Sequence, residues 1–224
     1  MEVHAVRPLI EACCDSIETA RAAQSCGAGR IELCGAGEGG TTPSLGMIAH
    51  CRALLVVPMA VMIRPRAGDF VYTAEEREVM SADILTARAL GVNAVVFGIL
   101  KTDGTVDADA MLPLVASARP MQVTFHRAFD RTPDAHAAFE SLLSLGIDTV
   151  LTSGHARFAL DGVQTLAALR ERAGEQLTVM AGGGVRAHNV HEIVSRSGVR
   201  AVHARATDPA VFAELTAAFG IEPE

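Results

Sequence analysis

The chain has 224 residues, half of them hydrophobic, and a formal net charge of −7. This length and composition predict one large domain or two small ones with a substantial core. The acidic balance argues against a nucleic-acid partner, and no apolar run approaches the roughly 20 residues that a bilayer helix requires. The first residues lack the basic flank, apolar stretch and cleavage site of a signal peptide. We therefore expect a cytoplasmic protein with no membrane partner.

Cysteine usage points to a reducing compartment as well. The five cysteines all lie in the first quarter of the chain, at Cys13, Cys14, Cys26, Cys34 and Cys51. An odd number without Cys-x-x-Cys spacing argues against a disulfide framework and against a zinc site. We expect all five to be free thiols.

Short apolar runs alternate with helical stretches along almost the whole chain. Several of these runs end on charged or polar residues, and each is followed by a turn or capping signal. The predicted strands are Pro8–Cys13, Arg30–Cys34, Pro58–Ile63, Ala94–Gly98, Gln122–Phe125, Asp148–Thr152, Leu177–Ala181 and Val199–His203.

Helix-capping signals separate these strands. Two segments, Asp15–Glu18 and Thr73–Glu76, have the spacing of a capping box, and Thr132-Pro133 and Asp208-Pro209 place proline at the first helical position. The predicted helices run from Asp15 to Gly27, from Pro43-Ser44 onward, from Thr73 to Leu90, from Asp107 to Ala118, from Thr132 to Leu145, from Leu160 to Arg172, from Asn189 to Ser195 and from Asp208 onward.

Eight strand–helix pairs in a chain of this length predict a single-domain (β/α)8 TIM barrel over residues 1–224. The alternative is an open doubly wound sheet, which usually has fewer pairs and a reversal in strand order. No linker or low-complexity segment divides the chain. In a TIM barrel the carboxyl ends of the strands and the loops that follow them face one mouth.

Two adjacent predicted strands end on Glu-x-Cys. Side chains two residues apart lie on the same face of a strand, so Glu11 should point with Cys13, and Glu32 with Cys34. Copper(I) prefers sulfur ligands, which makes Cys13 and Cys34 candidate ligands of a copper(I) ion. The alternative is that both cysteines pack as small buried hydrophobes.

Charged residues follow two further strands. Arg64 and Arg66 come after the third, where the intervening proline favours an extended backbone, and His126, Arg127 and Asp130 follow the fifth. Such groups are costly to desolvate at the end of a buried strand unless something binds there. We expect Arg64, Arg66 and His126 to point into the mouth, and Arg127 to point away from it unless the strand has already ended.

Several of these groups are suited to proton transfer. The alternative is structural, with Glu11 and Glu32 forming ion pairs with Arg64 and Arg127 inside the barrel. The candidates for general acid and base chemistry are Glu11, Glu32, His126 and Asp130.

Three glycines lie between the seventh predicted strand and the next helix. Barrel enzymes often bind phosphate there, through backbone N–H groups and a helix start, although a tight turn alone also explains the glycines. Arginine can clamp a carboxylate equally well. The candidate anion-binding residues are Arg64, Arg66, Arg127, Ser153, Gly182, Gly183, Gly184 and His203.

Ordered segments along nearly the whole chain together resemble the CutC family, which is named for copper homeostasis. The Arg-Pro-Arg and Phe-His-Arg-Ala-Phe-Asp segments are the most specific. The resemblance implies a cytoplasmic barrel, a homo-oligomer (dimer or tetramer) and copper handling, in some members copper(I) binding through cysteine. The matching segments are Arg30–Cys34, Gly39–Ser44, Met62–Phe70, Val123–Asp130, Leu151–Gly154 and Met180–Val185.

The chain departs from the family pattern in two places. Gly27-Ala-Gly-Arg30 stands where Gly-Ala-Asp-Arg is usual, and His203-Ala-Arg-Ala206 stands where His-Ser-Ser and a longer tail are usual. Losing the serines weakens any phosphate site shared by the last two loops, unless Arg205 replaces them as an anion partner.

Three functional hypotheses therefore stand side by side. The first is a copper homeostasis protein that binds copper(I) through Cys13 and Cys34. The second is a barrel enzyme that acts on a small anionic metabolite by acid–base chemistry. The third is a scaffold that serves only as an interaction partner. No organic cofactor is predicted, and the expected ligand at the mouth is a copper ion or a small anion.

Overall fold

The computed structural model describes residues 7–36 and 39–221, and strands and helices alternate along them. Each observed strand begins and ends within two residues of its predicted bounds. The strands are β1 (Leu9–Cys14), β2 (Arg30–Leu33), β3 (Met59–Met62), β4 (Ala94–Phe97), β5 (Gln122–Phe125), β6 (Thr149–Thr152), β7 (Thr178–Gly182) and β8 (Ala201–Arg205).

Every strand is followed by a helix. The helices are α1 (Ile17–Ser25), α2 (Leu45–Leu54), α3 (Ala74–Ala89), α4 (Ala108–Ala118), α5 (Ala135–Ser144), α6 (Val163–Ala173), α7 (Ala187–Ser197) and α8 (Pro209–Ala217), and a 3-10 helix, η1 (Arg127–Arg131), stands between β5 and α5.

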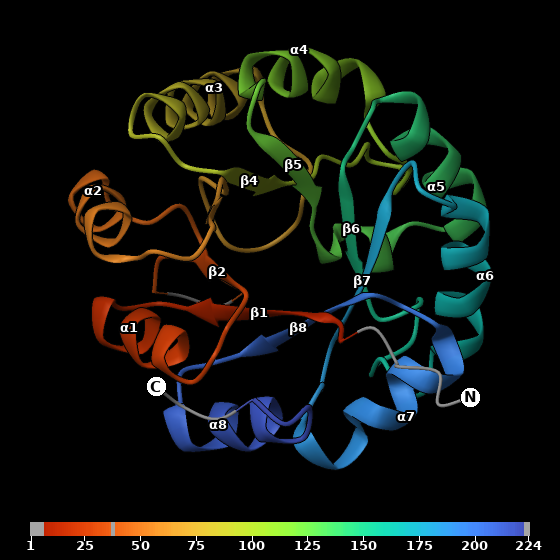
Figure 1. Ribbon diagram of the computed structural model, residues 1–224. Helices are drawn as coiled ribbons and strands as arrows, with labels where there is room; N and C mark the ends of the chain where they lie inside the picture. Colours follow the sequence, from red (N-terminus) through yellow and green to blue (C-terminus); the bar gives the residue numbers. More distant parts are fainter. Residues whose placement is uncertain (1–6, 37–38, 222–224) are drawn as a thin grey trace.

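The strands form one closed parallel barrel in sequence order, with β1 hydrogen-bonded to both β2 and β8. Figure 1 shows the strands as an inner ring and the helices as an outer ring, with α8 beside α1 where the ring closes. The (β/α)8 TIM barrel prediction is confirmed, and the open-sheet alternative is wrong. Residues 1–6 and 222–224 of the predicted domain lie outside the described residues.

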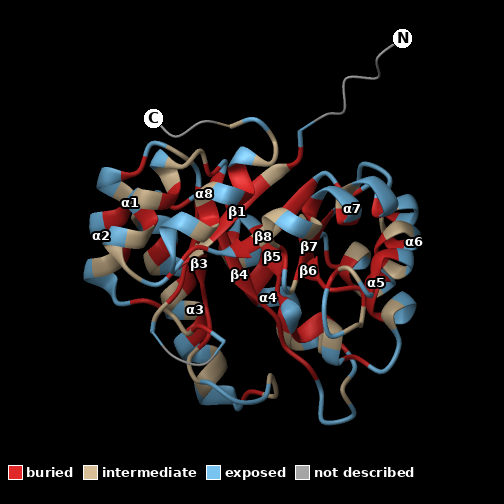
Figure 2. Cartoon of the chain, turned by 90° about the horizontal axis from the view of Figure 1, so that it is seen from below, coloured by how far each residue is buried: buried red, intermediate tan, exposed pale blue. Residues whose placement is uncertain are grey.

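The side chains of each barrel strand alternate between two environments, which are the core beneath the helices and the inside of the barrel. On β1, Ile10, Ala12 and Cys14 belong to the large core between the strands and the helices, whereas Glu11 and Cys13 point to the inside of the barrel. Figure 2 shows buried residues along the strands at the centre and exposed ones on the outer sides of the helices. The described helices include none that is long and apolar enough to cross a membrane.

The predicted starts of α2, α3, α4 and α8 are confirmed, whereas α6 begins three residues after the predicted Leu160 and α7 two residues before the predicted Asn189. Thr73 and Glu76 form the capping box of α3, and Asp208 caps α8 with Pro209 in its first turn. The predicted capping box of α1 is wrong by one residue, since Ser16 and Thr19 form it instead of Asp15 and Glu18. The reason is that β1 continues to Cys14, one residue beyond its predicted end, so the helix starts later.

The predicted start of α5 at Thr132-Pro133 is also wrong. Thr132 ends η1, where its hydroxyl donates a hydrogen bond to the carbonyl of Phe129 at 2.8 Å. The N-cap of α5 is Asp134, whose carboxylate accepts hydrogen bonds from the backbone N–H groups of His136 and Ala137. The 3-10 helix takes up residues that the prediction assigned to a loop, and its C-cap is Thr132, the residue predicted to begin α5.

Packing of the helices against the barrel predicts a contrast between two leucine substitutions. Leu166→Ala on α6 removes a side chain that is 0% exposed, whereas Leu112→Ala on α4 removes one that is 59% exposed. We expect the buried substitution to lower the free energy of unfolding by about 2–5 kcal/mol and the surface one to change it by less than about 0.5 kcal/mol. Urea denaturation followed by circular dichroism measures both, and equal losses would contradict the described packing.

Candidate functional site

A cavity of about 980 Å³ opens at the carboxyl ends of the barrel strands. Residues from most strand ends line it, because parallel strands in a closed barrel end on the same side. The sequence-predicted site residues that line it are Cys13, Glu32, Cys34, Arg64, His126, Arg127, Gly183, Gly184 and His203.

Two thiols lie together at one side of the cavity. Cys13 Sγ on β1 and Cys34 Sγ, just after β2, are 3.7 Å apart, and neither cysteine forms a disulfide. The parallel register pairs Cys13 with Glu32, which brings Cys34 diagonally next to Cys13 on the same face. The Cys34 thiol also donates a 3.4 Å hydrogen bond to Glu32 Oε2.

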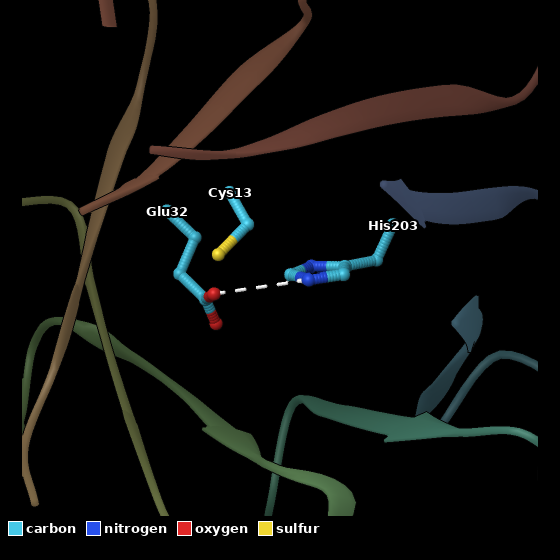
Figure 3. Close-up of side chains that lie close together, drawn as sticks. All are labelled: Cys13, Glu32 and His203. Carbon is cyan, nitrogen blue, oxygen red and sulfur yellow. Dashed lines mark ion pairs between the residues drawn. The ribbon is translucent and has the colours of Figure 1, made fainter. Parts of the chain in front are cut away.

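His203, on β8, completes a compact group with Cys13 and Glu32. One ligand atom from each of the three residues lies within 4.8 Å of the other two. Figure 3 shows the Cys13 sulfur and the Glu32 carboxylate turned toward the imidazole, with His203 Nε2 at 3.8 Å from Glu32 Oε2. Sulfur, nitrogen and oxygen donors in this arrangement can hold a metal ion.

Glu11 lies beneath this group and is fully buried. Its carboxylate accepts a 2.8 Å hydrogen bond from His203 Nδ1 and forms an ion pair with the Arg30 guanidinium. Burial raises the pKa of Glu11, but Arg30 and His203 outweigh it and hold that pKa below its usual value. Glu11 is therefore an ionised group that orients His203, and the predicted structural pairing with Arg64 or Arg127 is wrong because Arg30 is the partner.

Sequence reasoning missed Arg30 as part of the site. A signal was present, because Arg30 precedes Glu32 by two residues on β2 and so shares its face. Arg30 stands directly opposite Glu11 in the parallel register. Its side chain is buried, which a charged group tolerates only with a partner.

Four neighbouring side chains at the cavity have shifted pKa values: that of Cys13 is lowered, and those of Cys34, Glu32 and His203 are raised. The hydrogen bond between the thiols lowers the pKa of Cys13 well below its usual value and raises that of Cys34 well above it. Burial, followed by the charge of Cys13, raises the pKa of Glu32. Burial opposes the charge of His203, but Glu32, Cys13 and Glu11 outweigh it and raise the pKa of that imidazole. These directions favour the thiolate form of Cys13 and the imidazolium form of His203.

His126 follows β5 on another side of the cavity and is only 4% exposed. Its Nδ1 accepts a hydrogen bond from the backbone N–H of Ala128, and its ring packs against Phe70 with centroids 4.7 Å apart. Burial, aided by the charge of Arg64, lowers its pKa to about 3. The imidazole is therefore neutral and carries its hydrogen on Nε2, which has no hydrogen-bond partner within the described residues.

Asp130 is held in a structural network behind the cavity wall. Its carboxylate accepts hydrogen bonds from the Thr152 hydroxyl, the Ser153 hydroxyl and N–H, and the His155 N–H. It also pairs with Arg127 at 2.8 Å. Because its oxygens are occupied, Asp130 fastens η1 to the loop after β6, and it lies outside the cavity lining with Ser153.

Arg127 turns toward the cavity because β5 ends at Phe125, so strand alternation no longer decides its direction. Its guanidinium donates a 2.9 Å hydrogen bond to Ser153 Oγ. It also lies against Gly183, where an added Cβ would come within 3.2 Å of Arg127 Nη1. Gly182 ends β7 as a buried residue beneath the cavity lining.

The two arginines after β3 diverge. Arg64 is buried at the cavity and donates hydrogen bonds to the carbonyls of Gly40 and Gly68. Arg66 lies outside the cavity lining and pairs with Glu76 at 2.5 Å and with Asp69 at 2.9 Å. The prediction that both point into the mouth is wrong for Arg66, because β3 already ends at Met62 and extended alternation stops there.

Comparison with known proteins gives one consistent result. The model of the CutC family matches residues 8–208. A copper homeostasis protein cutC homolog of Mus musculus is 48% identical over 199 residues, which cover 88% of this chain and 73% of the relative. A family protein CutC of Xanthomonas campestris is 46% identical over 201 residues, which cover 89% of this chain and 84% of the relative.

A solved structure agrees. The copper homeostasis protein CutC of Streptococcus agalactiae superposes with a TM-score of 0.84 and is 34% identical, covering 88% of this chain and 97% of its own.

The buried environment of His126 predicts an unusual titration. Because its pKa in the folded chain lies near 3, below the 6.5 of a free histidine, the imidazole should stay neutral as the pH falls from about 8 to about 5. Nuclear magnetic resonance of the ring signals, assigned with His126→Gln, measures this directly. A midpoint near 6.5 in the folded protein would contradict the described burial.

Proposed function

The chain belongs to the CutC family, and we propose that it serves copper homeostasis by binding a copper(I) ion between Cys13 and Cys34. The observation that carries the proposal is the 3.7 Å separation of the two sulfur atoms at the cavity. Copper(I) is a soft ion that prefers thiolate ligands. Two sulfurs at the ends of adjacent strands, not joined by a disulfide, would supply such a pair of ligands.

The donor chemistry around the thiols fits the ion. His203 supplies an imidazole nitrogen close to Cys13, and its other nitrogen is held by Glu11. A hydrogen bond of that kind fixes the ring orientation of a metal-binding histidine. Glu32 lies equally close, but its hard oxygen suits copper(I) less well than sulfur or imidazole does. We assign Cys13 and Cys34 as the principal ligands and His203 as the third.

A cytoplasmic location forms part of the proposal. All five cysteines of the chain are free, including the neighbouring pair of Cys13 and Cys34. Free thiols so close together persist where glutathione and thioredoxin keep them reduced. The same reducing conditions favour the lower oxidation state of copper.

The dimensions of the cavity favour a second candidate function, which is acid–base catalysis on a small anionic metabolite. A volume of about 980 Å³ is at the upper end of small-molecule sites and far exceeds that of one metal ion. The pKa values of His203 and Glu32 are both raised above their usual values, and perturbed pKa values are typical of catalytic groups. The neutral His126 adds a hydrogen-bond donor.

The copper proposal predicts a specific loss on removal of the thiols. Cys13→Ala combined with Cys34→Ala should weaken copper(I) binding by at least about 100-fold, because among the described residues these are the two thiols whose side chains face the cavity. Cys14 also lines the cavity but points its side chain to the core, and Met62 offers a neutral thioether in place of a thiolate. Anaerobic competition with a chromophoric copper(I) chelator gives the affinity and the stoichiometry, which should be one ion per chain.

Cys26→Ala combined with Cys51→Ala is the matched control. Neither of these cysteines lines the cavity, so this double variant should bind copper(I) as the unaltered chain does. Equal affinity in the two double variants would refute the assigned ligands, provided that circular dichroism shows both to be folded.

A further inference from the structure

We propose that the basic wall of the cavity, formed by Arg127, Arg186 and Arg205 around the loop after β7, binds the phosphate group of a small phosphorylated metabolite. The proposal deepens the second candidate function by naming its ligand class. It does not depend on copper binding, since the wall and the thiol pair consist of different residues.

The charge of the cavity is opposite to that of the chain. The whole sequence has 19 lysines and arginines against 26 aspartates and glutamates. Among the described residues, the cavity is lined by six of the former and three of the latter. A cleft lined mainly by one sign of charge focuses its field and concentrates ions of the opposite sign. The six cations are Arg64, Lys101, Arg127, Arg131, Arg186 and Arg205.

Within the part of the chain that the structure describes, two arginines of the basic wall, Arg186 and Arg205, have no carboxylate partner, and the same is true of Arg131 on the cavity lining. The guanidinium of Arg186 donates one hydrogen bond, to the carbonyl of Val185, and that of Arg205 donates none. Elsewhere on the surface, Arg172 pairs with Glu140 and Arg196 with Glu192, although not every exposed arginine has such a partner. Positive charge at the cavity is therefore left for a ligand to neutralise.

The two unpaired arginines come from neighbouring parts of the barrel. In the register of β7 and β8, Gly182 stands opposite His203. Arg205 lies two residues beyond His203, and Arg186 is the N-cap of α7, shortly after Gly182. Both side chains line the cavity.

The backbone between them is shaped for close approach. Gly183 and Gly184 have φ values of +106° and +71°, a conformation that favours glycine. The Arg127 guanidinium lies against Gly183, within 3.2 Å of where a Cβ would be. The eleven-residue helix α7 then begins at Ala187, and a helix start attracts anions through its free N–H groups and its dipole.

An independent observation on another side of the cavity also points to a ligand. His126 is 96% buried and lines the cavity, and its Nε2 has no hydrogen-bond partner within the described chain. A buried donor without a partner costs about 1–3 kcal/mol, so native structures rarely leave one unsatisfied. An acceptor on the organic part of a ligand, whose phosphate lies at the basic wall, would satisfy it.

The ligand class follows from the number of cations. One carboxylate carries a single charge, which one arginine matches in a bidentate pair. Here two unpaired guanidinium groups, the nearby Arg127 and a helix start surround one loop. A phosphate monoester carries close to two negative charges at neutral pH and three acceptor oxygens. It therefore matches the wall better than a carboxylate does.

Isothermal titration calorimetry of the full chain tests the proposal. The probes are inorganic phosphate and glycerol 3-phosphate, with glycerol and acetate as comparisons. We expect both phosphates to bind, glycerol not to bind, and acetate to bind at least tenfold more weakly. Arg186→Ala and Arg205→Ala should each weaken glycerol 3-phosphate binding about tenfold or more, as expected for the loss of a charged hydrogen bond.

Arg196→Ala is the matched control, because Arg196 lies on α7, the helix that Arg186 caps, but outside the cavity lining. This variant should bind glycerol 3-phosphate as the unaltered chain does.

No binding of either phosphate, or equal affinity in the Arg186, Arg205 and Arg196 variants, would overturn the proposal. Tighter binding of acetate than of phosphate would overturn the ligand class. Copper(I) titration of the Arg186→Ala variant should be unchanged, which separates this test from that of the thiols.

Discussion

The mouth of this barrel depends on one buried carboxylate that holds two cations. Glu11 is fully buried and contacts the guanidinium of Arg30 and the imidazole of His203, so that it joins β1 to both of its neighbouring strands. Removing one partner of such a buried pair costs about 3–5 kcal/mol, because a charge is left without compensation. The position of His203, and through it the surroundings of Cys13 and Glu32, follow from this contact.

The cavity above Glu11 has two chemically different sides. The side formed by β1, β2 and β8 holds two thiols, a carboxyl group and an imidazole, all within a few ångströms. The side formed by the residues after β5 and β7 and by the last residue of β8 holds arginines and a glycine turn before a helix. Soft sulfur suits a copper(I) ion, and the arginines suit a phosphate. The two proposals therefore concern different atoms of one cavity and can both be correct.

Strand periodicity was sufficient to predict the barrel and part of the site. The Glu-x-Cys endings placed Glu11 and Cys13, and likewise Glu32 and Cys34, on shared inward faces, because alternation is reliable while the strand lasts. It failed for Arg66 because β3 ends at Met62, and the chain then follows loop geometry and the contact with Glu76. Asp130 was expected to act on a ligand, whereas its oxygens are occupied by Thr152, Ser153 and His155.

Contacts between strands explain what sequence reasoning could not reach. Arg30 becomes the partner of Glu11 only through the register of β1 and β2, and register is not encoded in the spacing along one strand. The isolation of His126 Nε2 likewise depends on how Phe70 and the residues after β5 pack in three dimensions. Both features follow from the packing of segments that lie far apart along the chain.

X-ray absorption at the copper edge of the copper(I)-loaded chain tests the central claim most directly. If Cys13, Cys34 and His203 hold the ion in the orientation that Glu11 imposes, the spectrum should show two sulfur neighbours and one imidazole nitrogen. Glu11→Gln should keep both sulfurs and weaken the imidazole contribution. A spectrum with nitrogen and oxygen neighbours only would contradict the account.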